Sequence, residues 1–307
     1  MKGSFESFGE LVSTRGGGGT LVVAAAHDAQ TLEGAFAAAA RFGLECHLVG
    51  DAEKIKRICD EKGAAPASVT HEPAAAAAAA AAVSMARDCP RGILVKGMLE
   101  TGALLKAAVS REGGIRKSGT MSHVAFLEIP AYHKLLAVTD GGMCQSPGLA
   151  QKADILKNAL SLWRGLAGEG FAPKVAVLSA SERVDAKLED SVHGAELAAL
   201  ARGGEFGDAI VAGPISFDLA ASRESAMKKG YESPVCGDAD ILLVPGITAG
   251  NALCKSLVEW AGARMAGVVA GARVPIVLVS RSAGWEEKLN SIALCLGPAP
   301  IDNSGRV

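Results

Sequence analysis

The sequence predicts an α/β protein with mostly parallel sheets, because short apolar runs alternate with helix-length amphipathic segments along almost all of its 307 residues. The predicted strands are near-continuous apolar runs, without regular alternation of polar residues, which is typical of strands that helices cover on both faces. They are residues 21–26, 46–49, 93–95, 135–138, 174–178, 209–211, 241–244, 266–270 and 276–279. The segments between them predict crossover helices at residues 31–42, 99–109, 149–166, 189–201 and 249–261.

The chain length and one break in this alternation indicate two domains. A chain of 307 residues exceeds the size at which single hydrophobic cores stop growing. Residues 122–129 and 134–138 resemble an antiparallel pair joined through Pro130, so we place the domain change there. We expect a first domain of residues 1–133 completed by residues from about 268 to 307, and a second domain from about 134 to 267.

We expect two low-complexity segments to have structural roles and no part in a binding site. The nine alanines at 74–82 favour a helix, because alanine has the highest helix propensity. The glycines at 16–19 precede the first strand, whereas a phosphate-binding loop follows one, so we expect a flexible lead-in there.

Composition excludes several classes of partner. Hydrophobic residues make up 49% of the chain, yet no apolar run is long enough for a membrane crossing. The formal net charge of −2, with both signs interspersed, offers no basic stripe for nucleic acid. The seven cysteines are scattered without paired spacing, which argues against a zinc cluster or a disulfide framework. We expect a cytoplasmic protein with small-molecule partners and no bound metal.

The clearest chemistry follows the last predicted strand. There an apolar run ends in Ser280 and Arg281, and Glu286 and Glu287 follow within one short segment. Ligands of parallel α/β sheets bind at the carboxyl ends of the strands, where the N–H groups that open the next helix also point. The segment therefore predicts a site for an anionic substrate.

Further candidate residues follow other strands. Glycine pairs permit close backbone approach to a ligand, and Asn251 and Lys255 are four residues apart, on one face of a helix. The candidate binding residues in the second domain are Gly141, Gly142, Asp238, Asn251 and Lys255, and those in the first domain, as holders of anions, are Thr101, Lys106 and Arg116.

Between residues 20 and 296 the chain resembles the phosphate acetyl/butyryl transferases, and most closely the phosphate butyryltransferase branch. The strings that carry the resemblance are TDGGM, QKADILKNAL, PKVAVLSA, GPISFDLA, SPVCGDADILLVPGITAGNALCKSLV and SRSAGWEEKLNSIAL, with KGM and SHV in the first half. The resemblance implies two α/β/α domains with mostly parallel sheets and an active-site cleft between them. This architecture is shared with isocitrate and isopropylmalate dehydrogenases.

The resemblance also implies an activity: reversible transfer of a short-chain acyl group between coenzyme A and inorganic phosphate, with butyryl preferred and acetyl as the alternative. The substrates are then acyl-coenzyme A, phosphate and acyl phosphate, with no permanently bound cofactor, and the protein is a homo-oligomer. In the relatives a Ser-Arg pair is catalytic, which maps onto Ser280 and Arg281. Their thiol-deprotonating carboxylate falls at Glu287, whereas the butyryl branch tends to carry it at Glu286, so the base stays open between the two.

These residue types suit such a transfer. A carboxylate can accept the thiol proton, a guanidinium can hold the phosphoryl oxygens, and Ser280 can donate to the carbonyl oxygen. We favour direct attack over an acyl-serine, because no histidine lies near Ser280 in sequence, although His27 stays an alternative base. The alternative functions are a metal- and nicotinamide-dependent 2-hydroxy-acid dehydrogenase and a non-catalytic small-molecule binding protein.

Overall fold

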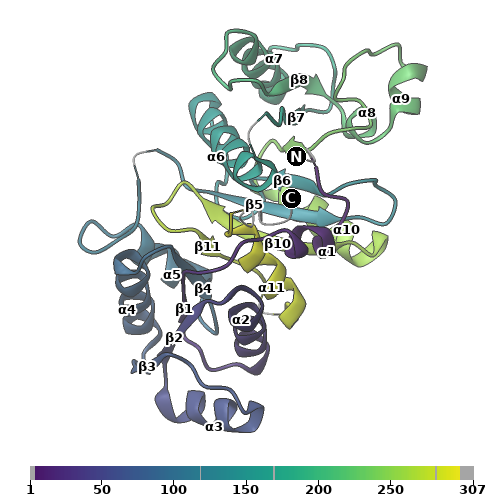
Figure 1. The fold of residues 1–307 in the computed structure, drawn as a ribbon. Coiled ribbons are helices and arrows are strands. Elements are labelled where there is room, and N and C mark those ends of the chain that lie inside the picture. The colour runs from purple at the N-terminus through teal and green to yellow at the C-terminus, as the bar shows by residue number, and fades with distance from the viewer. Residues whose placement is uncertain (1–3, 118, 169, 281, 298–307) are drawn as a thin grey trace, which may run out of the picture. The chain divides into compact units, whose positions relative to one another are not determined.

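The computed structural model describes residues 4–117, 119–168, 170–280 and 282–297. Its contacts divide the chain into two compact units, which are described separately (Figure 1). The central unit comprises Met1–Phe8 and Gly119–Met265, and the flanking unit comprises Gly9–Ser118 and Ala266–Val307. Within the described residues, no helix combines the length and the apolar character that a membrane span requires.

The flanking unit is a mostly parallel sheet with helices on both faces. Its strands run in the order β3-β2-β1-β4-β11-β10, and only β10 is antiparallel to its neighbour β11. The strands are β1 (Thr20–Ala24), β2 (Glu45–Gly50), β3 (Ser68–His71), β4 (Gly92–Lys96), β10 (Arg264–Ala270) and β11 (Ile276–Val277). The helices are α1 (Phe8–Ser13), α2 (Ala29–Phe42), α3 (Ala52–Lys62), α4 (Ala75–Asp88), α5 (Thr101–Ala108) and α11 (Trp285–Leu294).

The strand order of the flanking unit fixes which face each helix covers. The chain steps outward from β1 to β3 and then crosses back to β4, so right-handed connections place α2 and α3 on one face and α4 on the other. Helix α11 packs against α2, and α5 packs against α4. Asp28 caps the start of α2 by accepting from the Thr31 N–H, and Gly43 ends the helix in the left-handed conformation.

The central unit is a second mostly parallel sheet, of order β5-β6-β9-β7-β8, in which only β5 runs antiparallel to its neighbour. Its strands are β5 (Ser122–Glu128), β6 (Leu136–Thr139), β7 (Lys174–Leu178), β8 (Ile210–Ile215) and β9 (Ile241–Leu243). Its helices are α6 (Leu149–Ala167), α7 (Glu189–Arg202), α8 (Phe217–Ala221), α9 (Arg223–Lys228) and α10 (Ile247–Ala261). The predicted antiparallel pair is confirmed as β5 and β6, and the mixed α/β class with mostly parallel sheets is confirmed as well.

Two cores form on the faces of the central sheet. On one face, residues of β5, β6, β7 and β9 pack against Leu219, Ala226 and Cys254 from α8, α9 and α10. On the other face, the buried Trp163 of α6 stacks with Phe5 and lies 5.1 Å, between ring centroids, from Phe126. Both faces of the sheet are thus covered, as the continuous apolar strands require.

Candidate active site

In the flanking unit, three strand tips meet at one edge of the sheet. Strand β4 pairs in parallel with β1 and with β11, so the carboxyl ends of all three lie side by side. Beyond them follow His27 and Asp28 after β1, Lys96 at the tip of β4, and Ser280 after β11. The sequence therefore brings a hydroxyl, an imidazole, a carboxylate and an ammonium group to the edge where parallel sheets bind ligands.

The close approach of these tips depends on glycine. A Cβ on Gly97 would lie 2.5 Å from the carbonyl oxygen of Ala25, a contact that the backbone does not permit. The N–H of Gly97 instead donates to the Ala24 carbonyl at 2.9 Å, which joins the two strand tips.

Ser280 is exposed, and its Oγ lies 2.9 Å from the Ser282 hydroxyl. Within the described residues no histidine is a hydrogen-bond partner of Ser280, so the geometry provides no base that would activate it as a nucleophile. Arg281, predicted as the phosphate ligand, lies outside the described residues.

Glu286 and Glu287 begin α11, and their surroundings differ. Glu286 is exposed. Glu287 is half-buried, and its Oε1 is fully buried with no hydrogen-bond partner among the residues that the structure describes. Burial raises the pKa of Glu287 from its ordinary 4.5 to about 7, although the charge of Lys288 opposes the shift. A carboxylate with such a pKa gives up and takes up protons near neutral pH.

Lys288 organises this edge. Its side chain is buried, and its Nζ donates to the Ala283 carbonyl at 2.6 Å, which fastens the loop between Ser280 and α11. Burial lowers the pKa of Lys288, and the charges of Asp28 and Glu287 act in the opposite direction. The ammonium group thus lies close enough to both carboxylates for their charges to act on its pKa.

Helix α11 is held against α2 at short range. The N–H of Trp285 donates to the side-chain oxygen of Gln30 at 3.0 Å, which satisfies one of the open N–H groups of the helix. A Cβ on Gly34 would lie 2.7 Å from the Trp285 carbonyl oxygen, so the glycine sets how closely the helices approach. This packing fixes the position of Glu287 relative to the strand tips.

Buried polar atoms without partners gather at this edge. Within the described part of the chain, His27 Nδ1 and Asp28 Oδ2 lack hydrogen-bond partners, as Glu287 Oε1 does. Most buried polar atoms in folded proteins are hydrogen-bonded, so three such atoms near one sheet edge indicate groups kept for a ligand. Asp28, Lys96 and Lys288 are not among the residues predicted from the sequence, although a lysine that ends an apolar strand, as Lys96 does, was a usable signal.

The other first-domain candidates are dispersed. Thr101 begins α5 and follows the β4 tip. Lys106 lines a hollow of about 660 Å³ with residues of α4, including Ala76 and Ala80. Arg116 is bridged to Ala272, which precedes β11, and therefore lies toward the edge opposite Ser280. The structure does not place Lys106 or Arg116 beside the residues that follow the tips of β1, β4 and β11.

In the central unit, Gly141, Gly142 and Asn251 come together where β6 ends and α10 begins, and Lys255 follows one turn further along α10. The Asn251 amide donates to the Gly141 carbonyl at 3.4 Å. Close packing within the unit accounts for these two glycines, whereas the sequence had led us to expect that they admit a ligand. A Cβ on Gly141 would lie 2.8 Å from the backbone of Gly250, and one on Gly142 would lie 2.8 Å from the ring of His123.

A pocket of about 390 Å³ opens beside these residues, lined by the starts of α6, α7 and α10. The buried Lys152, which lines this pocket, is not among the residues predicted from the sequence. The Nζ of Lys152 lies 2.8 Å from Asp190 Oδ1 and 3.1 Å from His193 Nδ1.

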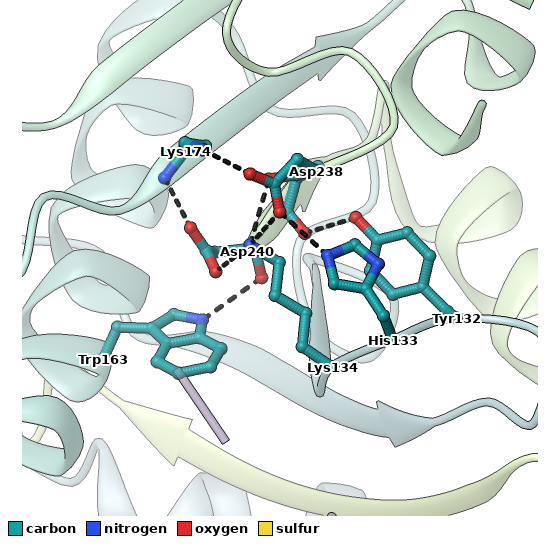
Figure 2. A network of polar contacts seen from close by, with 8 residues as sticks. Tyr132, His133, Lys134, Trp163, Lys174, Asp238 and Asp240 are labelled. Carbon is teal, nitrogen blue, oxygen red and sulfur yellow. Dashed lines mark hydrogen bonds and ion pairs between the residues drawn. The ribbon is translucent and has the colours of Figure 1, made fainter. Parts of the chain in front are cut away.

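Asp238 precedes β9 and so lies at the amino-terminal edge of the central sheet, whereas Asn251 and Lys255 follow β9 on α10. Figure 2 shows the polar network around Asp238. Asp238 forms ion pairs with Lys174 and, at 2.8 Å, with Lys134, while the His133 ring lies 2.9 Å away. Burial raises the pKa of Asp238, but hydrogen bonds from Lys134, Lys174 and His133 outweigh burial and hold it below the ordinary value.

The neighbouring Asp240 completes this network. It forms an ion pair with Lys134 at 2.7 Å and accepts from the Lys174 N–H at 2.8 Å, and Trp163 donates to its backbone carbonyl. The network thus ties the starts of β6, β7 and β9 together. In the described ranges, no three His, Cys, Asp or Glu side chains are grouped so that they could hold a metal ion.

Comparison with known proteins assigns the chain to a family. Residues 51–296 match the family described as phosphate acetyl/butaryl transferase. A probable phosphate butyryltransferase of Bacillus subtilis (strain 168) is 36% identical over 277 residues, which cover 90% of this chain and 92% of the relative. A phosphate acetyltransferase of Thermotoga maritima is 37% identical over 283 residues, which cover 91% of this chain and 95% of the relative.

A solved structure agrees with the sequence relatives. A branched-chain phosphotransacylase from Enterococcus faecalis V583 superposes with a TM-score of 0.76 at 32% identity, covering 90% of this chain and 97% of that protein. The matched family model and these relatives agree: the chain belongs to the phosphate acetyl/butaryl transferase family.

Proposed function

We propose that this phosphate acyltransferase moves a short-chain acyl group, preferably butyryl, between coenzyme A and inorganic phosphate in a single ternary complex. The observation that carries the proposal is the half-buried Glu287, whose pKa of about 7 suits an acceptor of the thiol proton. The dehydrogenase and binding-protein alternatives are not favoured, because the relatives described above are named as acyltransferases.

The reaction needs a group that accepts the thiol proton, and Glu287 is the proposed acceptor. An unperturbed thiol has a pKa of about 8.5, so coenzyme A is mostly protonated at neutral pH. A carboxylate raised to about 7 is closer to the thiol in proton affinity than an ordinary carboxylate. We assign the base to Glu287 and not to Glu286, because Glu286 is exposed to solvent.

In the direction that forms the thioester, the S–H proton passes to Glu287 as sulfur attacks the acyl carbon of the acyl phosphate. The bond between that carbon and the bridging oxygen then breaks, and phosphate leaves with the electron pair. In the opposite direction a phosphate oxygen attacks the thioester, and Glu287 returns the proton to the departing sulfur.

Three other groups have proposed roles in charge stabilisation. Ser280 donates to the carbonyl oxygen as negative charge develops on it, a contribution for which the loss of one donor typically costs about 10²- to 10³-fold. Arg281 holds the phosphoryl oxygens in a planar, two-point contact. The buried Lys96 adds a cation at the tip of β4, one position before the chain turns.

In the central unit we propose Asn251, Lys255, Gly141 and Gly142 as substrate-binding residues. Thr101, at the start of α5, is the proposed substrate-binding residue of the flanking unit. Asp238 is left out of this set, because cations already occupy its carboxylate at the far edge of the sheet. We further propose a cytoplasmic homo-oligomer that works without a permanently bound cofactor.

The test is release of free thiol from butyryl-coenzyme A, followed with a colorimetric reagent in the presence and absence of phosphate. We expect release that depends on phosphate, and kcat/KM higher for butyryl than for acetyl thioesters. Release without phosphate would identify a thioesterase, and no release in either condition would favour a binding protein.

A further inference from the structure

The turn that follows β1 carries two side chains with unused acceptor atoms, which we call the acceptor row: His27 Nδ1 and Asp28 Oδ2. Both atoms are buried, and neither has a hydrogen-bond partner in the described ranges of the chain. The other oxygen of Asp28 is occupied, because it accepts from the Thr31 N–H at 2.8 Å and so caps α2. An imidazole nitrogen accepts when the second ring nitrogen carries the proton. Each side chain therefore keeps one atom for a donor on a ligand.

The backbone of this turn is strained and firmly held. Ala25, directly after β1, has a φ of 52°, in the left-handed region that residues with a side chain rarely adopt. Its carbonyl accepts from the Met98 N–H at 3.0 Å, which ties the turn to the tip of β4. Strain of this kind persists where the surrounding structure fixes it, and it is concentrated at binding and catalytic sites. The turn thus presents His27 and Asp28 in a set geometry.

The acceptor row extends along the carboxyl edge of the flanking sheet, away from Glu287. On one side, Asp28 lies close enough to Lys288 of α11 for its charge to act on the ammonium group, as the charge of Glu287 does. On the other side, a Cβ on Gly50 would lie 3.2 Å from His27 Nδ1, so the imidazole ring lies at the tip of β2, the strand beside β1. The order along the edge is therefore Glu287, Asp28, His27.

We propose that the acceptor row binds the pantetheine arm of coenzyme A, with Asp28 accepting from the amide N–H nearest the sulfur and His27 from the second amide N–H. This inference rests on the proposed function, in which Glu287 receives the thiol proton. Pantetheine carries its two amide N–H groups one after the other behind the thiol. A proton acceptor followed by two hydrogen-bond acceptors matches the order of those groups.

The charge of Asp28 decides which part of the substrate fits here. A carboxylate repels a phosphate group, whether it belongs to acyl phosphate or to the diphosphate of coenzyme A. A neutral amide N–H instead donates to a carboxylate, and such a bond is stronger than one between two neutral groups. The uncharged segment of coenzyme A therefore suits the acceptor row, and the phosphates bind elsewhere.

The first test measures the binding of coenzyme A and of pantetheine to the full-length protein by titration calorimetry, without an acyl donor. Asp28→Asn keeps the cap of α2, because asparagine caps as well as aspartate, but it places an N–H donor where the free oxygen was. Both dissociation constants should rise about 10- to 150-fold, as for the loss of a hydrogen bond to a charged group. His27→Phe keeps a flat ring without the acceptor and should raise them about 2- to 10-fold.

Asp51→Asn is the matched control. Asp51 caps α3 in the same unit by accepting from the Lys54 N–H, and its second oxygen pairs with the Lys54 ammonium group at 3.2 Å. Because neither oxygen is free, this variant should bind coenzyme A as the wild type does. Circular dichroism checks that each variant is folded, and Asp28→Ser, which also caps a helix, replaces Asp28→Asn if that variant is not. Unchanged binding in the folded Asp28 variant, or an equal loss in Asp51→Asn, would overturn the proposal.

The second test assigns each acceptor to one amide. It compares kcat/KM for the butyryl thioesters of pantetheine, N-acetylcysteamine and propanethiol, which carry two, one and no amide N–H. The loss in Asp28→Asn should appear with the first two thioesters and be absent with the third. The loss in His27→Phe should appear with the pantetheine thioester alone. Losses of equal size with all three thioesters would overturn the assignment.

Failure of the proposed function would be a separate result. A wild type that binds coenzyme A with the expected dependence on Asp28, but releases no thiol from butyryl-coenzyme A, would contradict acyl transfer and support the acceptor row. Phosphate-dependent thiol release with equal coenzyme A affinity in wild type and Asp28→Asn would overturn the acceptor row alone. A wild type that binds neither coenzyme A nor pantetheine would overturn both.

Discussion

Asp238 and Glu287 are two partly buried carboxylates that the fold treats in opposite ways. Asp238, at the amino edge of the central sheet, is surrounded by Lys134, Lys174 and His133, and its pKa is lowered. Glu287, at the carboxyl edge of the flanking sheet, keeps one oxygen without a partner among the described residues, and burial raises its pKa to about 7.

The difference separates a carboxylate that stabilises the fold from one that can take part in proton transfer. A fully paired carboxylate is stable in its charged form and ties strands together, so it contributes to stability and little to reactivity. An unpaired one lowers stability but stays able to exchange a proton, which is the usual price of a functional site. The comparison therefore predicts opposite consequences for removing the two charges.

The largest expected effect is on turnover. Glu287→Gln keeps the size of the side chain but removes the base, so kcat for thioester formation should fall by about 10²- to 10⁴-fold. Glu286→Gln is the matched control, because Glu286 is exposed and has no proposed part in proton transfer. The rate of this variant should stay within about threefold of wild type. Equal losses in the two variants would remove the distinction between these residues.

The next effect is on stability. Asp238→Asn should lower the free energy of unfolding by about 2 to 4 kcal/mol at pH 7, because it leaves Lys134 and Lys174 without their shared anion. Since the folded pKa is lowered, this stabilisation is present above the ordinary value and is lost as pH falls below it. Chemical denaturation at pH 7 and pH 3 measures the difference.

The control for that measurement is Glu224→Gln in the same unit. Glu224 pairs with Lys228 on an exposed helix surface, and such pairs contribute about 0 to 1 kcal/mol. If Asp238→Asn were no more destabilising than this control, the network at the amino edge would not carry the structural role described.

Glu287→Gln should change the free energy of unfolding by less than Asp238→Asn does, and in the opposite direction, so that the variant is more stable than wild type. The folded wild type keeps the Glu287 proton up to a pH of about 7, whereas the unfolded chain loses it near the ordinary 4.5. Wild-type stability therefore falls between those values as pH rises. Glutamine cannot ionise, so the variant should exceed wild type by roughly 1 to 3 kcal/mol above pH 7, and the difference should vanish below pH 4.5. Thermal unfolding across this range would contradict the account if the variant were less stable at pH 8.

Much of the fold follows from the sequence, because buried parallel strands leave continuous apolar runs such as 175–178 and 241–243. Strand β3 escaped prediction, since Ser68–His71 alternates between half-buried and exposed residues at the sheet edge and offers no apolar run. Helix α3 escaped for a similar reason, as only Ile55, Ile58 and Cys59 of its eleven residues are buried.

The site was less accessible to sequence reasoning. Sequence placed Ser280, Glu286 and Glu287 after a strand, but two adjacent glutamates look alike until burial distinguishes them. Asp238 illustrates the opposite problem. It lies close to Gly246 and Asn251 in the chain, yet strand β9 runs between them and carries them to opposite edges of the sheet.

The most direct measurement is the pH dependence of kcat/KM for coenzyme A in the direction of thioester formation, compared between wild type and Glu287→Gln. The wild-type rate should rise about tenfold per pH unit at low pH and level off near pH 7, and this limb should disappear in the variant. A wild-type limb near pH 4.5, or the same limb near pH 7 in Glu287→Gln, would contradict the assignment of Glu287 as the base.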